Sequence, residues 1–203
     1  MNAVNAEAQP ASRWRVLGTA GVLLVLGAVG AFLAQGLRAL EVDGAARARE
    51  YFGDSAPPFG LVLAEALGMP SGEKVVRFAR PEPAAGPNAA LFIEYPSRAP
   101  VEALLSGSYS GDIGMRVKEW ERDPKESWNA TIKRDELEWG TWHTKWIVER
   151  SFHAGGGWHE EARVDLGTKA RQLVLFVHWP DQTPADEKQV LELLGAFRMP
   201  AGA

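Results

Sequence analysis

Histidine is the residue type in this chain best suited to chemistry, because imidazole binds metal ions and moves protons near neutral pH. The four histidines are 143, 153, 159 and 178, and all lie in the C-terminal half. That half is also rich in segments that alternate between apolar and polar residues, the pattern of half-buried β-strands. The histidines are therefore expected on neighbouring strands of one sheet.

The register of these strands decides which histidines meet, since a slip of one residue moves a side chain to the other face. Matching the apolar positions on the two sides of the turn at 154–157 places His153 opposite His159. Closing the following hairpin with a four-residue loop, 167–170, places His178 opposite His159 as well. The sequence thus predicts a row of three histidines across three strands.

Such a row could hold zinc. Strands lie about 4.8 Å apart, and three rings that lean inward can place nitrogens about 2.0 to 2.1 Å from one ion while leaving a fourth position for water. That water could act as a nucleophile near neutral pH. A metal-binding protein or metal-dependent hydrolase using His153, His159 and His178 is therefore the alternative function. The competing interpretation, solvated or hydrogen-bonded structural histidines without metal, is the commoner situation for strand histidines.

No other motif indicates an enzyme. The triplet Gly155-Gly156-Gly157 has no following Lys-Ser/Thr and opens no helix, so it is not a phosphate loop. No Gly-x-Ser-x-Gly sequence marks a nucleophile elbow. We therefore assign no catalytic or cofactor-binding residue, and a non-enzymatic function is preferred.

The elements that would position the histidines form an α+β domain, an antiparallel sheet with a C-terminal helix packed on it. A helix capped by Ser97 should run through Leu105, and a last helix capped by Thr183 should begin at Pro184. The expected strands cover residues 60–67, 74–80, 89–95, 114–120, 129–138, 141–153, 158–166 and 171–179.

The order of these elements resembles the PsbP/Mog1-like family. The shared features are an N-terminal hairpin, a short helix after the third strand, a closing meander, and a Pro-marked loop before a C-terminal helix that ends Leu193-Leu194-Gly195-Ala196-Phe197-Arg198. The resemblance covers roughly residues 59–199. It implies an exported or membrane-attached α+β domain that is largely non-enzymatic.

Tryptophan provides a second potential binding chemistry, since an exposed indole can stack on a sugar, glycan or peptide. The strand pattern places Trp142, Trp146 and Trp179 on the core face, so core packing is the preferred interpretation for them. Trp139 and Trp158 lie near strand ends and are expected to be the most exposed.

The run from Val16 to Ala34 contains 19 residues without a charge. Extended to Leu37, it is long enough as a helix to cross the roughly 30 Å hydrocarbon core of a bilayer. Arg13 and Arg15 precede it and favour a cytoplasmic N-terminus. The alternative is a cleaved signal peptide with a site at 34–36. We expect a retained signal-anchor, with the C-terminal domain outside the cytoplasm, in the periplasm or at the cell surface.

Composition narrows the remaining classes. The 203 residues carry a formal net charge of −4 and no basic stripe, so nucleic-acid binding is not expected. There is no cysteine, which excludes disulfides, thiolate chemistry and a lipoprotein acyl anchor. The composition is typical of a bacterial protein. The expected organisation is a cytoplasmic tail (1–15), a transmembrane helix (16–37), a juxtamembrane spacer (38–58) and an extracytoplasmic domain (59–203).

These features together predict a membrane-anchored extracytoplasmic accessory or binding module. Its partners would be membrane lipid through residues 16–37 and another envelope protein or a cell-wall polymer. The oligomeric state stays open.

Overall fold

The computed structural model describes residues 42–82, 84–107 and 113–198. The chain divides into two compact units, 1–41 and 42–203. The second unit contains a seven-stranded antiparallel sheet and a C-terminal helix, so the predicted α+β class is confirmed. The predicted transmembrane helix at 16–37 lies outside the described residues, and within them no helix is long and apolar enough to cross a membrane.

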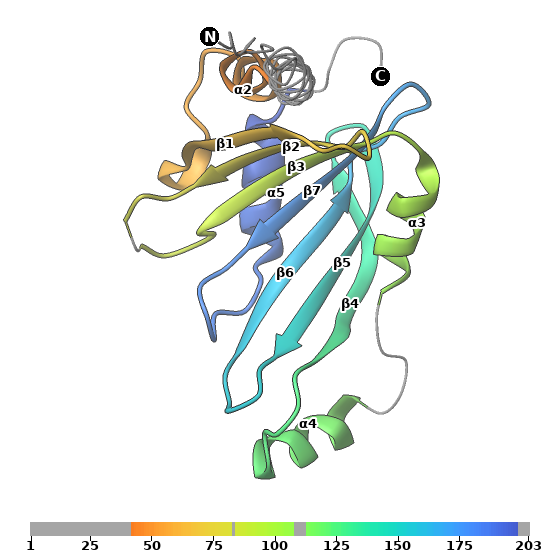
Figure 1. Cartoon of the computed structure of the whole chain (residues 1–203). Helices are drawn as coiled ribbons and strands as arrows, with labels where there is room; N and C mark the ends of the chain where they lie inside the picture. Colours follow the sequence, from red (N-terminus) through yellow and green to blue (C-terminus); the bar gives the residue numbers. More distant parts are fainter. Residues whose placement is uncertain (1–41, 83, 108–112, 199–203) are drawn as a thin grey trace, which may run out of the picture. The chain divides into compact units, whose positions relative to one another are not determined.

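The sheet has the strand order β1-β2-β3-β7-β6-β5-β4 (Figure 1). The last strand in the sequence therefore lies in the middle of the sheet, between β3 and β6. The strands are β1 (Val62–Gly68), β2 (Lys74–Ala79), β3 (Ala89–Tyr95), β4 (Trp128–Trp139), β5 (Trp142–Phe152), β6 (Trp158–Asp165) and β7 (Gln172–His178). The helices are α2 (Gly44–Phe52), α3 (Arg98–Ser106), α4 (Ile113–Arg122) and α5 (Glu187–Ala196), with a 3-10 turn, η1 (Pro58–Gly60).

Helices cover both faces of the sheet. On one face, α2 and α5 pack over the main core, where Phe92 of β3 stacks on Tyr51 and Phe197 with ring centroids 4.5 and 5.3 Å apart. On the other face, α3 inserts Val101 against the outward residues of β7. Because both faces of β7 are covered, its five central residues are all buried, as a near-continuous apolar run requires.

Two expected elements differ from the structure. Residues 113–122 form α4 rather than a strand, and the straight-chain residues Arg116, Lys118 and Glu119 are good helix formers. The last helix begins at Glu187 rather than Pro184, because Asp186 is its N-cap and accepts a hydrogen bond from the Lys188 amide at 2.9 Å.

Part of the expected spacer contributes to the core. Within residues 38–58, α2 begins after Asp43, whose carboxylate accepts a hydrogen bond from the Ala46 amide at 2.9 Å. The helix then buries Tyr51 and Phe52 against the sheet. Residues 44–52 are thus built into the same unit as the strands.

Candidate functional site

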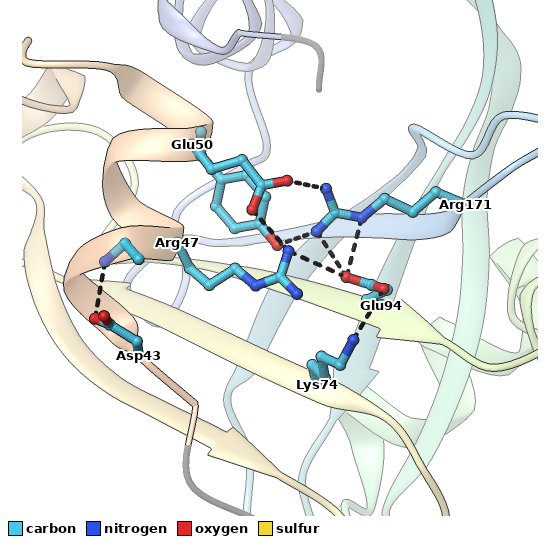
Figure 2. Close-up of polar contacts among 8 residues, drawn as sticks. Asp43, Arg47, Glu50, Lys74, Glu94 and Arg171 are labelled. Atoms are coloured by element: carbon cyan, nitrogen blue, oxygen red, sulfur yellow. Dashed lines mark hydrogen bonds and ion pairs between the residues drawn. The ribbon is translucent and has the colours of Figure 1, made fainter. Parts of the chain in front are cut away.

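An ion-pair network joins α2 to the sheet, and Figure 2 shows its members pointing toward one another from α2, β2, β3 and the approach to β7. Arg171 pairs with Glu50 of α2 and, at 2.6 Å, with Glu94 of β3. Its guanidinium also donates to the Tyr51 hydroxyl at 3.2 Å. Arg47 adds a second link from α2 to the sheet, pairing with Glu94 at 3.5 Å, and it also pairs with Glu50 within the helix at 2.6 Å. The network fixes the helix that directly follows the apolar N-terminal segment.

The electrostatics of this network keep Tyr51 neutral and Glu94 ionised at neutral pH. Burial raises the pKa of Tyr51 to about 12, so the phenol stays protonated at neutral pH. Burial alone would also raise the pKa of Glu94, but the charges of Arg171 and Lys74 outweigh it and lower that pKa. Glu94 is therefore ionised at neutral pH.

The α3 face of the sheet carries a different polar row from the one expected. Glu149 of β5 lies opposite Glu161 of β6, and Glu161 lies opposite His178 of β7. The His178 ring is 3.2 Å from the Glu161 carboxylate. Arg163 bridges the two acids, 2.7 Å from Glu161 and in contact with the almost fully buried Glu149. This row is a compensated charge cluster, with Arg163 also donating to the Leu104 carbonyl of α3 at 3.3 Å.

Burial lowers the pKa of His178, although the Glu161 carboxylate opposes this effect. A histidine with a lowered pKa is predominantly neutral at pH 7. The neutral ring can still accept or donate one hydrogen bond through each nitrogen, according to its tautomer.

The other two candidate histidines contact each other. His153 Nε2 lies 2.8 Å from His159 Nδ1, and the rings stack with centroids 4.8 Å apart. One ring must donate and the other accept, so the bond requires at least one neutral imidazole. The turn at 154–157 brings them together, because the His153 amide donates to the Gly157 carbonyl at 3.0 Å.

The predicted register was wrong by two residues in both hairpins. His159 lies opposite Ser151 rather than His153, because the first turn closes on residues 153 and 157. His178 lies opposite Glu161 rather than His159. The second hairpin closes more tightly than expected, since Thr168 and Arg171 bond across a two-residue tip instead of a four-residue loop.

The structure therefore brings His153 and His159 together and places His178 against Glu161. Among residues 42–82, 84–107 and 113–198, no group of three or more His, Cys, Asp or Glu side chains is arranged to hold a metal ion. The Glu161 carboxylate beside His178 already pairs with Arg163. Zinc binding by His153, His159 and His178 stays an untested alternative.

Tryptophans line one concave surface. Trp146 and Trp179 are buried in the core, but Trp142, expected there, is 38 % exposed. It lies directly opposite Trp139 at the β4–β5 turn, beside a cavity of about 250 Å³ whose lining includes Arg98 and Asp165. Arg98 holds Asp165 through two hydrogen bonds of 3.0 and 2.5 Å. An exposed indole beside a fixed polar pair provides a surface on which a flat or apolar group could stack.

Sequence reasoning missed the network that joins α2 to the sheet. This network joins residues far apart in the chain, such as Glu50 with Arg171, and pairing of this kind cannot be assigned without the register. One signal was available: Glu50 precedes the aromatic pair Tyr51-Phe52, and two large aromatic residues are unusual in a solvated spacer.

No protein-family model matches the chain, and no curated protein matches its sequence.

Proposed function

We propose that this chain is a single-pass membrane-anchored module that presents a non-catalytic binding domain outside the cytoplasm. Residues 16–37 form the anchor, and the α+β unit that follows is the presented domain. Its partner is another envelope protein or a cell-wall polymer. The PsbP/Mog1-like resemblance agrees with an exported, largely non-enzymatic domain.

The fixed attachment of α2 carries this proposal. Only six residues, 38–43, separate the apolar run from α2, which is held to the sheet by Arg171 and by burial of Tyr51 and Phe52. A short connection keeps a domain close to the membrane surface. A freely secreted domain has no need of such a connection.

The side-chain chemistry of the described residues supports binding more than catalysis. Glu161, which faces His178, and its cross-strand neighbour Glu149 are both compensated by Arg163. By contrast, the surface at Trp142 combines an exposed indole with a cavity, and aromatic side chains in such positions are frequent contributors to binding. We assign partner binding to this surface.

Accessibility of introduced cysteines tests the anchor and its orientation, since the native chain has no cysteine. Two full-length variants are compared in spheroplasts: Ala170→Cys at the exposed β6–β7 turn and Ala3→Cys in the N-terminal tail. A membrane-impermeant maleimide should label Ala170→Cys in intact spheroplasts and Ala3→Cys only after lysis. Carbonate at high pH should leave both in the membrane pellet.

The reverse labelling pattern would overturn the orientation. Release by carbonate, or a mature chain shortened by cleavage near residue 36, would overturn the retained anchor. The binding surface is tested separately with Trp142→Ala, which should reduce recovery of a crosslinked partner while leaving labelling at residue 170 unchanged. Equal recovery with Trp142→Ala would overturn the assignment of the surface.

A further inference from the structure

Strand β1 and the turn after it carry four of the seven exposed large hydrophobic side chains among the described residues. Val62, Leu63 and Leu67 on the strand, and Met69 in the turn after it, are between 38 and 51 % exposed. β1 is an edge strand (Figure 1), and most of its residues are exposed, although α2 packs beside Leu63 and Ala66. Clustered exposed apolar side chains of this kind mark an interaction surface.

The length of chain before α2 limits where this surface can lie. Resting on the proposed anchor, the apolar run ends at Leu37 and the described domain begins at Val42. Five residues extend over at most about 17 Å. The interfacial layer of a bilayer is itself roughly 5 to 7 Å deep on each side. The beginning of α2 is therefore held close to the headgroups.

The beginning of α2 lies against β1. Gly44, the first residue of the helix, packs so closely on β1 that an added Cβ would be 2.8 Å from the Ala66 Cβ and 3.1 Å from Leu63. The strand with the exposed apolar side chains is thus the strand nearest the tether.

We propose that β1 and its turn form a membrane-docking edge, with Val62, Leu63, Leu67 and Met69 in contact with the interfacial layer of the same bilayer that holds the anchor. Transfer of aliphatic side chains from water into this layer is favourable, because it lowers the free energy of the system.

A second copy of the chain is a poorer occupant. Complete antiparallel pairing of residues 62–68 with the same residues of another copy places Glu65 opposite Glu65, and like charges directly opposite are destabilising. The register of β1 also shifts between Leu63 and Glu65, and such an irregularity hinders edge-to-edge pairing.

Lipid quenching of site-specific fluorophores tests the proposal in the full chain, reconstituted in phosphatidylcholine vesicles. Three variants carry an environment-sensitive dye: Leu67→Cys on β1, Ile132→Cys on β4, and Leu24→Cys in the apolar run. Ile132 is the matched control because it is an apolar residue, 37 % exposed, on the opposite edge strand. Nitroxide-labelled lipids quench only dyes that contact the bilayer.

We expect a blue shift and lipid quenching at positions 24 and 67 and neither at position 132. Quenching at 24 with no difference between 67 and 132 would overturn the docking edge but leave the anchor intact. Absence of quenching at 24 would overturn the anchor, and docking with it. A blue shift at 67 that grows with protein density and is not quenched by lipid would assign the edge to a second copy instead.

Discussion

Replacing Arg171 with methionine should loosen α2 from the sheet. Methionine keeps the length and apolar stem of arginine but removes the charge that pairs with Glu50 and Glu94 and the donor to Tyr51. Breaking a fully buried ion pair by removing one partner costs about 3–5 kcal/mol. Here the side chains of Arg171, Glu94 and Glu50 are 15, 20 and 31 % exposed, so water screens part of the loss.

The remaining cations reduce the loss further. In the variant, Glu94 keeps Lys74 at 3.3 Å and Arg47 at 3.5 Å, and Glu50 keeps Arg47 at 2.6 Å. We therefore expect Arg171→Met to lower the free energy of unfolding by about 2 kcal/mol. Arg49→Met, the same change at an exposed position of α2, should alter it by less than about 0.5 kcal/mol.

The assay is urea unfolding of the full chain in nanodiscs, followed by tryptophan fluorescence, with hydrogen exchange of the α2 amides as a local readout.

The loss of stability caused by Arg171→Met should depend on pH. The pKa of Glu94 is lower in the folded protein than in the unfolded chain. Ionised Glu94 therefore stabilises the fold fully at pH values above its pKa in the unfolded chain, and this stabilisation is lost as the pH falls through its pKa in the folded protein. The gap between wild type and Arg171→Met should narrow in acid. Equal stabilities of Arg171→Met and Arg49→Met at pH 7 would refute the reasoning.

Two further predictions concern the packing of α2. Gly44→Ala should destabilise the protein by about 1–3 kcal/mol, because its Cβ would clash with Ala66. Gly195→Ala in α5, where an added Cβ would have nothing within 4 Å, should be neutral or stabilising by up to about 1 kcal/mol. Urea unfolding compares the two variants, and equal effects would contradict the close approach of Gly44 to β1. Because the pKa of Tyr51 is raised to about 12 in the folded protein, its contribution to the free energy of unfolding is complete below pH 10. Between about pH 10 and 12 the free energy of unfolding should fall by up to about 2–3 kcal/mol. Tyr51→Phe should lack this loss, and parallel pH profiles of stability for the two proteins would contradict the prediction.

The local elements of the fold could be predicted from the sequence because they follow from short-range patterns. The third strand was expected at 89–95 and is observed as Ala89–Tyr95. The apolar spacing of Val190, Leu193 and Leu194 correctly identified the buried face of the last helix. The strand expected at 114–120 is wrong, since these residues lie in α4, because a short stretch of this kind does not distinguish a strand from an exposed helix.

The candidate site could not be predicted, because it depends on loop closure. The apolar pattern constrains register only to the correct face, and a slip of two residues preserves the face while changing every cross-strand partner. Because the hairpin closes tightly between Thr168 and Arg171, the cross-strand partner of His178 is Glu161 and not the expected His159. Hydrogen bonds from distant residues also decide such closures: the Gly155 amide, for example, donates to the Pro124 carbonyl at 2.7 Å.

The position of β7 in the middle of the sheet imposes an order on folding. β3 can pair with its second neighbouring strand only after β7 has been synthesised. Similarly, α2 lies near the start of the domain but completes its contacts only after Arg171 and Phe197 have been synthesised. Contacts between such distant segments slow folding, since a long loop must close before they form. The fold of a chain emerging from the ribosome or a translocation channel therefore stays incomplete until Phe197 has emerged. Under the proposed anchor, the domain would complete its folding on the membrane surface after the whole chain has crossed.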